Sequence, residues 1–300
     1  MTARIALATA AEFPDLDDDG AVLVEALATL GIAAEPAVWT DPSVDYSQFD
    51  LVVVRSTWDY HDRLAEFLAW ADRVAATTAL ANSARVLAWN TDKTYLRELE
   101  AAGLPVVHTT WLDPGDRFTV PVAGEYVVKP AVSAGSRNTN RYIPGDHDEI
   151  AVDHVGSLLA DGRTVMVQPY LDAIDTDGET ALLFFGGTFS HAVRKGPLLE
   201  AGMQLVQSAY KQETMLARPA SAGELAVADR VLDALPATGA GVARGDLLYA
   251  RVDLVPGADG SPVLLELELA EPSMFLLYDG AAGVAAAARF AAAIAARVSA

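Results

Sequence analysis

Apolar and polar positions alternate with two different periods along the first ninety residues. Strand-like runs are separated by stretches with the spacing of amphipathic helices, which predicts strands at 4–9, 32–39 and 49–60 and helices at 21–31 and 63–76. Strand, helix, strand units of this kind build a parallel sheet. Because ligands bind beyond the carboxyl ends of parallel strands, the polar loop "RSTWDY" at 55–60 lies where we expect a ligand.

After residue 90 the pattern changes to a helix followed by shorter strands. The segment 91–103 has helical spacing and ends at Gly103. Beyond about residue 110 we expect a hairpin-rich sheet, with strands in "VVHTTWL", "EYVVKPA", "TVMVQPYLD" and "ETALLFFGGTFSHAVRKGP", a helix at 221–235, and two strands joined by the turn "PGADGSP". The predicted fold class is therefore α/β, with an α+β arrangement in the C-terminal part.

Composition limits the classes of function. The 300 residues are 52% apolar and 21% charged, as in ordinary globular proteins, and their formal net charge is -20. This charge argues against nucleic acid or an anionic membrane as a partner, since both require basic patches. The absence of cysteine excludes disulfides, thiolate zinc sites and a cysteine nucleophile, and it fits a cytoplasmic protein.

Neither end of the chain is predicted to enter a membrane. The N-terminus has only a short apolar run that is followed at once by acidic residues, so we expect no secretory signal. The alanine-rich stretch 281–298 is weakly apolar and is interrupted by Arg289 and Arg297. These features favour a packed terminal helix over a membrane span.

The strand pair within 250–273 carries four charges at regular spacing. Side chains alternate across a strand, so Arg251 and Asp253 share a face, as do Glu266 and Glu268. If the turn closes a hairpin, the acidic faces meet, and apolar surroundings then require a cation between them. Such oxygen ligands suit Mg²⁺, and two ions bridged by Glu266 could clamp a phosphoryl group. Solvated acids on an amphipathic strand are the alternative.

Three further segments are compatible with nucleotide chemistry. Lys129 ends an apolar strand before a Gly/Ser loop whose backbone N–H groups can surround phosphate oxygens, although a surface turn would look the same. The strand ending at Gln168 and Pro169 leaves backbone groups free to pair with an adenine edge, or it stops at proline for structural reasons alone. Arg194 and Lys195 follow an apolar strand, either as functional charges or as a solvated strand end.

Taken in order, these motifs resemble those of ATP-grasp ligases. "NTDK" and "VVKP" each hold a lysine, "SAGSRN" is similar to the loop that closes on phosphates, and "VQPYLD" is similar to the adenine hinge. "RVD" followed by "ELELAEPS" resembles the magnesium signature of D-alanine ligases and glutathione synthetases. One departure is Glu268, where many relatives have asparagine, and it adds a negative charge to the metal cluster. The resemblance spans about residues 85 to 290.

The resemblance implies an ATP-grasp fold with three parts. These are a pre-grasp α/β domain at 1–88, a central lobe at 89–166 and a C-terminal lobe at 167–300, with ATP between the two lobes. The residues that it assigns to ATP are Lys93, Lys129, Ser133, Gly135, Ser136, Gln168, Pro169, Tyr170, Leu171 and Asp175. Those that it assigns to magnesium, with two ions expected, are Asp253, Glu266 and Glu268. Those that it assigns to the developing charge of an acyl phosphate are Arg194, Lys195 and Arg251. Homodimers are common among such ligases, and we expect one here.

Within the superfamily, the first ninety residues are most similar to the cyclo-ligases that convert O-ureido-D-serine into D-cycloserine. The similarity rests on "EFPDLDDD", "VVVRSTWDY" and "WNTDK". It implies that ATP activates the carboxylate of a small amino acid, after which the ring closes and the carbamoyl group leaves as carbon dioxide and ammonia. The residues placed near this substrate are Arg55, Ser56, Thr57, Trp58, Asp59, Tyr60 and Ser273. Asp59 is the candidate partner of the substrate ammonium group.

Two other functions remain compatible with the sequence. An intermolecular carboxylate-amine ligase, which makes a dipeptide or a glutathione-like amide, would use the same residues. A nucleotide-binding regulatory or scaffold protein would keep the fold without turnover. The intact set of Arg251, Asp253, Glu266 and Glu268 argues against the scaffold. For the loop 55–60, a Trp/Tyr pair that covers the sheet is the structural alternative.

Overall fold

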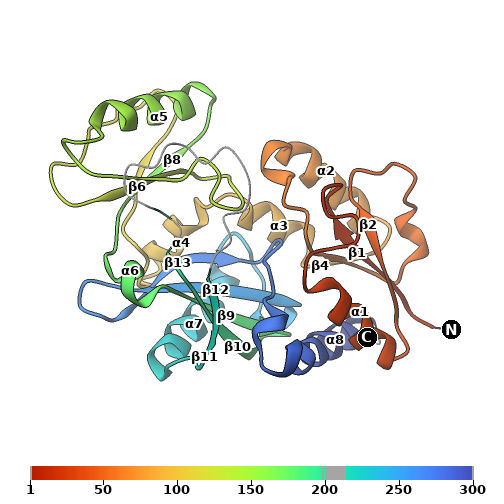
Figure 1. The fold of residues 1–300 in the computed structure, drawn as a ribbon. Coiled ribbons are helices and arrows are strands. Elements are labelled where there is room, and N and C mark those ends of the chain that lie inside the picture. The colour runs from red at the N-terminus through yellow and green to blue at the C-terminus, as the bar shows by residue number, and fades with distance from the viewer. Residues whose placement is uncertain (1, 198, 200–213, 299–300) are drawn as a thin grey trace.

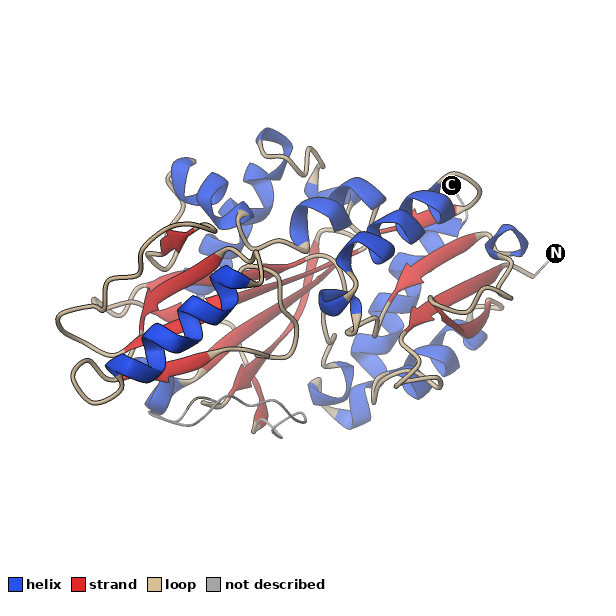
Figure 2. Cartoon of the chain, turned by 90° about the horizontal axis from the view of Figure 1, so that it is seen from above, coloured by secondary structure: helices blue, strands red, loops and turns tan. Residues whose placement is uncertain are grey.

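The computed structural model describes residues 2–197, 199 and 214–298, which form three parts (Figure 1). The N-terminal domain lies on one side of the molecule, and a central and a C-terminal lobe lie on the other. Both marked chain ends are on the side of the N-terminal domain (Figure 2). The last helix therefore returns to the domain with which the chain begins.

The N-terminal domain is built on a parallel sheet with the strand order β2-β1-β3-β4. Its elements are β1 (Arg4–Thr9), α1 (Gly20–Thr29), β2 (Ala33–Val38), β3 (Leu51–Val54), α2 (Leu64–Ala75) and β4 (Ala79–Ala81). Alternation along β1 sends Ile5 and Leu7 into the core that includes α1, and Ala6 and Ala8 into the core that includes α2. The parallel sheet predicted for this part is confirmed, with somewhat shorter elements.

The alanine-rich end of the chain is a helix packed on this domain. Phe290 and Ile294 of α8 (Val284–Val298) are fully buried in one cluster with Leu23 and Leu27 of α1. Among the described residues, no helix is long and apolar enough to cross a membrane. The prediction of a packed terminal helix is confirmed.

Two short helices, α3 (Ala84–Asn90) and α4 (Tyr95–Ala101), lead from the N-terminal domain to the central lobe. The single helix predicted over 91–103 is wrong in its start. The Asp92 carboxylate accepts a hydrogen bond from the Thr94 N–H at 2.9 Å, which is a turn typical of aspartate before a helix. This turn separates the two helices and places Lys93 on the connection between them.

The central lobe has a four-stranded antiparallel sheet in the order β5-β8-β6-β7. Its elements are β5 (Thr110–Leu112), β6 (Tyr126–Pro130), β7 (Asn140–Tyr142), α5 (Asp148–Ala160) and β8 (Val165–Pro169). Val155 of α5 is fully buried with Val128 and Val167 of the sheet. Because β8 ends at Pro169, this sheet extends beyond the predicted boundary at residue 166.

The C-terminal lobe has a five-stranded antiparallel sheet in the order β11-β10-β9-β12-β13. Its elements are α6 (Ala173–Asp177), β9 (Glu179–Phe185), β10 (Thr188–Lys195), β11 (Met215–Arg218), α7 (Ala222–Ala234), β12 (Tyr249–Pro256) and β13 (Pro262–Glu268). The predicted helix at 221–235 is confirmed as α7, which begins with a capping box between Ser221 and Glu224.

The two faces of this sheet differ in character. Val252 and Leu254 on one face are buried with α7 and α4. On the other face, Leu183 and Tyr249 are buried with α8. Arg251 and Asp253 share this second face by strand alternation. The charged residues therefore continue an apolar face that is joined to the N-terminal domain.

Acid should destabilise the central lobe through His154 of α5. Tyr142 accepts a hydrogen bond from Asn140 at 3.0 Å, and its hydroxyl lies 2.9 Å from His154 Nδ1. Burial lowers the pKa of His154 from 6.5 to about 4. Between these values His154 is protonated in the unfolded chain and neutral in the folded chain. The free energy of unfolding therefore falls as the pH drops from 6.5 toward 4, by at most about 3 kcal/mol. Urea unfolding of His154→Leu should show a smaller loss over this window, and an unchanged slope would contradict this assignment.

Candidate active site

The acidic hairpin closes as the sequence predicted. Arg251 of β12 lies opposite Glu268 of β13, and Asp253 lies opposite Glu266. The register then shifts, because Leu254 pairs with Leu264 and leaves Leu265 as an extra residue. Directly opposed residues leave the same face of a sheet. The four charged side chains therefore meet at one place.

Lysines and an arginine hold these carboxylates. Arg251 Nε donates to Asp253 Oδ1 at 2.9 Å, and Arg251 Nη2 also pairs with Glu268. Lys195 Nζ lies 3.3 Å from Asp253 Oδ2 and 2.8 Å from Glu179 Oε2. Lys93 Nζ lies 3.1 Å from Glu266 Oε1. The cluster thus contains cations from three segments that are distant in sequence.

The pKa shifts show where this neutralisation is incomplete. Burial opposes the ionisation of Asp253, but Arg251 and Lys195 outweigh it and lower the pKa of Asp253. Burial also opposes the ionisation of Glu266, but Lys93 and Lys129 together outweigh it and lower the pKa of Glu266. Burial raises the pKa of Glu268 to about 7 despite Arg251. Two carboxylates are therefore matched, and a third retains a deficit of positive charge.

A second lysine and a small-residue loop adjoin this cluster from the central lobe. Lys129 at the end of β6 is buried, and burial lowers its pKa although Glu266 opposes the shift. Lys93 Nζ donates to the Ser133 carbonyl at 2.8 Å and so holds the start of the loop. Gly135 and Ser136 have φ values of 60° and 57°. This left-handed backbone turns the loop sharply, as a phosphate-covering loop requires.

The predicted adenine hinge follows β8. Gln168 is buried, and its amide donates to Thr109 Oγ1 at 2.9 Å. Pro169 ends β8 opposite Tyr126. Leu171 follows on the connection from β8 to α6. The Tyr170 hydroxyl donates to Asp175 Oδ1 at 2.5 Å. The resemblance assigns the carboxylate of Asp175 to the ribose of ATP, and in the structure the hinge itself holds this carboxylate.

Arg194 lies apart from the charged cluster. In β10 it pairs with Thr180, whereas its neighbour Lys195 pairs with Glu179. Successive side chains leave opposite faces of a strand, so only Lys195 shares the face of Asp253. The Arg194 guanidinium donates to the carbonyls of Asp177 and Thr176 at 2.5 and 2.7 Å. The structure therefore separates Arg194 from Arg251, with which the sequence grouped it.

The first half of the predicted substrate loop is buried. Arg55 donates to the Pro272 carbonyl at 3.3 Å and pairs with Asp17 at 3.3 Å. Ser56 Oγ lies 2.8 Å from Thr9 Oγ1. Thr57 is fully buried, and its hydroxyl has no partner. In this structure Arg55 joins the N-terminal domain to the segment after β13.

The second half of the loop faces the acidic strand. Trp58 Nε1 donates to the Glu271 carbonyl at 2.9 Å, and the Tyr60 hydroxyl bonds to the Glu271 carboxyl. Asp59 instead accepts a hydrogen bond from Trp39 Nε1 at 2.8 Å. The Ser273 carbonyl accepts a hydrogen bond from Arg251 at 3.2 Å. The loop, the segment after β13 and the charged cluster thus form one connected wall.

Glu271 is a candidate site residue that sequence reasoning missed. Its side chain is buried, and burial together with the charge of Glu268 raises its pKa to about 8. The motif "ELELAEPS" contains it, but strand alternation selects only Glu266 and Glu268. The strand ends at Glu268, so alternation does not apply to residue 271. Its signal in the sequence is a third carboxylate immediately before Pro272.

The carboxylates fit magnesium in their chemistry but not yet in their arrangement. Among the described residues, no three His, Asp or Glu side chains are grouped closely enough to hold an ion. Asp253, Glu266 and Glu268 each point to a cation of the protein instead. Oxygen donors of this kind suit Mg²⁺, which usually shares its ligands with phosphate oxygens. Metal binding here requires that these ion pairs rearrange.

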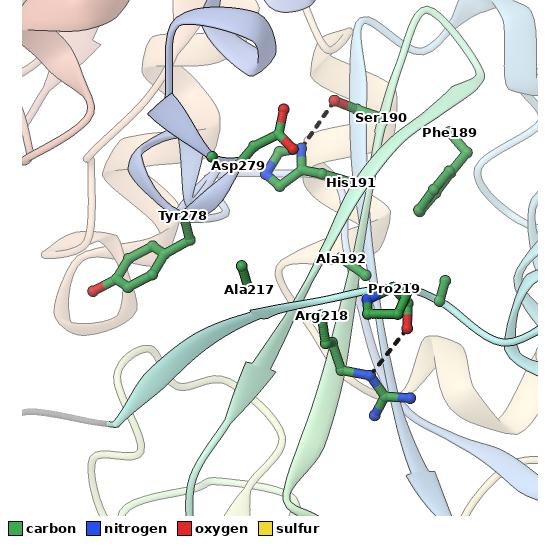
Figure 3. Close-up of a pocket in the computed structure, with 11 residues that line it drawn as sticks. Phe189, Ser190, His191, Ala192, Ala217, Arg218, Pro219, Tyr278 and Asp279 are labelled. Carbon is green, nitrogen blue, oxygen red and sulfur yellow. Dashed lines mark hydrogen bonds between the residues drawn. The ribbon is translucent and has the colours of Figure 1, made fainter. Parts of the chain in front are cut away.

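A cavity of about 500 Å³ lies at β10, β11 and the turn 278–280 (Figure 3). On its wall, His191 Nδ1 lies 2.9 Å from Ser190 Oγ, and Nε2 lies 3.1 Å from the Met274 carbonyl. Burial lowers the pKa of His191, so a neutral ring donates from Nε2 to this carbonyl. The residues that line the cavity do not include the charged cluster, and His191 on its wall contacts the segment after β13 at the Met274 carbonyl.

The comparisons with known proteins agree with this geometry. A family model of the N-terminal domain of D-cycloserine synthetase DcsG matches residues 5–82. The chain is 41% identical to the cycloserine biosynthesis protein DcsG of Streptomyces lavendulae, over 92% of this chain and 95% of that protein. The crystal structure of D-cycloserine synthetase DcsG matches with a TM-score of 0.84 and 40% identity, covering 98% of this chain and 99% of that one.

A more distant likeness concerns the fold alone. D-alanine–D-alanine ligase of Bacillus anthracis, complexed with ATP, matches with a TM-score of 0.64 and 12% identity, over 99% of this chain and 97% of that one. The fold and its neighbours define an ATP-grasp ligase. Within this class, the chain belongs to the D-cycloserine synthetase family.

Replacing Glu271 by glutamine should stabilise the protein above neutral pH. The folded chain keeps the proton of Glu271 up to about pH 8, whereas the ordinary pKa is 4.5. Unfolding therefore releases a proton between these values, and the stability of the wild type falls as the pH rises through this window. We expect Glu271→Gln to raise Tm by roughly 2–6 °C at pH 8 and to match the wild type near pH 4.5. A variant that melts like the wild type at pH 8 would refute the shift.

Proposed function

We propose that this ligase uses ATP and magnesium to activate the carboxylate of O-ureido-D-serine as an acyl phosphate and closes it to D-cycloserine. One water molecule is consumed to release the carbamoyl group, and ADP, phosphate, carbon dioxide and ammonia are the other products. One observation carries the proposal: the loop 55–60 contacts the segment after β13, and this segment contacts the charged cluster through Arg251. The 41% identity to a cycloserine biosynthesis protein over nearly the whole chain supports the choice of substrate.

The described residues divide the work of the reaction. Lys93 and Lys129 hold the phosphates of ATP beneath the loop that begins at Ser133. Asp253, Glu266 and Glu268 would hold magnesium, which when bound shields the phosphate oxygens and polarises the transferred phosphoryl group. Arg251, which already contacts Asp253 and the Ser273 carbonyl, stabilises the charge that develops on the substrate carboxylate.

Ring closure asks mainly for positioning. The attacking nitrogen and the activated carboxyl belong to one molecule, so a folded substrate conformation supplies the proximity that an intermolecular ligase obtains by binding a second substrate. The half-buried Trp58, together with the buried Tyr60 and Glu271, suits such a compact substrate. The enzyme forms no covalent bond with it in this scheme.

Glu271 is our candidate for the substrate ammonium group in place of Asp59. Asp59 already accepts a hydrogen bond from Trp39 and lies 3.9 Å from Arg63. Burial and the charge of Glu268 raise the pKa of Glu271, and the positive charge near it does not offset them. An ammonium ion at this position would supply that charge and lower the pKa, so Glu271 would ionise as the substrate binds.

Substrate specificity should therefore change in Glu271→Gln. We expect KM for O-ureido-D-serine to rise about 100-fold, because a charged hydrogen bond of about 3 kcal/mol is lost, while KM for ATP changes little. An analogue without the amino group should react equally with wild type and variant. An unchanged KM for the amino acid, or an equal loss with the analogue, would remove Glu271 from this role.

The reaction itself is tested by supplying ATP, magnesium and O-ureido-D-serine. We expect formation of ADP that depends on this compound alone, with ammonia and the ring product detected by mass spectrometry. Glu266→Gln should fold normally and lose turnover by at least about 100-fold, the loss typical of removing one electrostatic group. A requirement for a second amine would favour intermolecular ligation, and nucleotide binding without turnover would favour a scaffold.

Two expectations from the sequence remain predictions. The structure contains one chain, so the expected homodimer is tested by light scattering of the purified protein. The cytoplasmic location is tested by fractionating cells that express the full chain.

A further inference from the structure

The free edge of β13 needs hydrogen-bond partners that no neighbouring strand provides. Among the described residues, β13 is the last strand of its sheet. At Leu264 the edge pairs with the segment 105–107, where Val107 N–H donates to the Leu264 carbonyl at 2.9 Å. Beyond this point, backbone groups that stay buried and unpaired would destabilise the strand. Side chains take over as partners there.

Tyr95 and Asn90 satisfy the edge at the acidic residues. The Tyr95 hydroxyl donates to the Leu267 carbonyl at 2.7 Å and accepts from the Leu267 N–H at 2.9 Å. Asn90 Nδ2 donates to the same carbonyl at 2.8 Å. Asn90 Oδ1 accepts from the N–H groups of Leu269 and Ala270 at 2.6 and 3.1 Å.

Asn82 extends this row and ties it to β12. Its Nδ2 donates to the carbonyls of Leu269 and Tyr249 at 2.7 and 3.0 Å. Its Oδ1 accepts from the Leu248 N–H at 2.8 Å. Asn82, Asn90 and Tyr95 are all buried. Three side chains thus stand in the place of a sixth strand, and we call them the side-chain ladder.

The ladder acts where the position of the strand matters for chemistry. Leu267, which Tyr95 and Asn90 hold on both its N–H and its carbonyl, lies between Glu266 and Glu268. Lys93, from the same short segment as Asn90 and Tyr95, pairs with the Glu266 carboxylate. One segment therefore fixes both the backbone and a side chain of this acidic pair.

We propose that Tyr95 and Asn90 are positioning residues for magnesium and that they act by holding the backbone between Glu266 and Glu268. The proposal rests on the proposed function in one respect, the assignment of these carboxylates to the metal. Packing alone does not explain the ladder. The ring of Tyr95 lies in the apolar core of the lobe, where phenylalanine would fill the same space, so the hydroxyl is present for its hydrogen bonds.

Tyr95→Phe tests the proposal against Tyr142→Phe as a matched control. Both tyrosines are 2% exposed, and both hydroxyls have hydrogen-bond partners, but only Tyr95 touches the acidic strand. Calorimetry would give the affinity for ADP in EDTA and at a series of magnesium concentrations, with Tm measured for each protein. The affinity of a protein for its metal often falls 10- to 100-fold when a residue that holds a metal ligand in place is removed.

We expect both variants to lose a similar few degrees of Tm and to bind ADP in EDTA like the wild type. Tyr95→Phe alone should need about 10-fold more magnesium for tight ADP binding. Equal magnesium dependence in the two variants would overturn the proposal. Asn90→Ala gives an independent check, since it removes the bonds to Leu267 and Leu269 without changing Tyr95, and an unchanged magnesium requirement in that variant would also count against it.

Glu266→Gln separates this inference from the function on which it rests. If Glu266→Gln leaves the magnesium dependence of ADP binding intact, the metal assignment itself is wrong. If Glu266→Gln loses that dependence and Tyr95→Phe keeps it, the metal assignment holds and the positioning role fails.

Discussion

The structure depends on the neutralisation of buried carboxylates by cations from distant segments. An unpaired buried charge costs several kcal/mol even after the protein relaxes around it, and Asp253, Glu266 and Glu268 lie at one place. Lys93, Lys129, Lys195 and Arg251 offset most of this cost, since they hold two of the three carboxylates ionised. The raised pKa of Glu268 shows that the cost of burying its charge is not fully offset. A site built in this way is stable without a ligand. A ligand that brings positive charge stabilises it most.

The segment after β13 passes this constraint to the rest of the molecule. Its successive carbonyls accept hydrogen bonds from side chains: Glu271 from Trp58, Pro272 from Arg55, and Ser273 from Arg251. The first two donors belong to the N-terminal domain, and the third belongs to the charged cluster. A shift of this segment must therefore disturb the substrate loop and the carboxylates together. Through this linkage, the charge state of the carboxylates affects the loop 55–60, and with it the binding of a substrate to the N-terminal domain.

Local rules were sufficient for the parts of the site that follow strand alternation. The meeting of Arg251 with Glu268 and of Asp253 with Glu266 follows from period two and a closed turn, and the structure has this pairing. Arg194 was misplaced because a sequence motif does not say which of two adjacent basic residues faces the site. That choice depends on the register of β10 against β9.

Long-range contacts decide the remainder. The buried Arg55 donates to the Pro272 carbonyl, which is 217 residues away in sequence. Glu271 lies beyond the end of its strand, where alternation no longer predicts direction. The start of α4 depends on the turn at Asp92, which a helical pattern over the whole segment obscures.

The most direct test of this account is a crystal structure with ADP and Mn²⁺ in place of magnesium, with the metal located by its anomalous scattering. The account predicts metal density bounded by Asp253, Glu266 and Glu268, with Lys93 and Arg251 turned toward the nucleotide. Metal density elsewhere, with the three carboxylates still paired to their lysines and arginine, would contradict it.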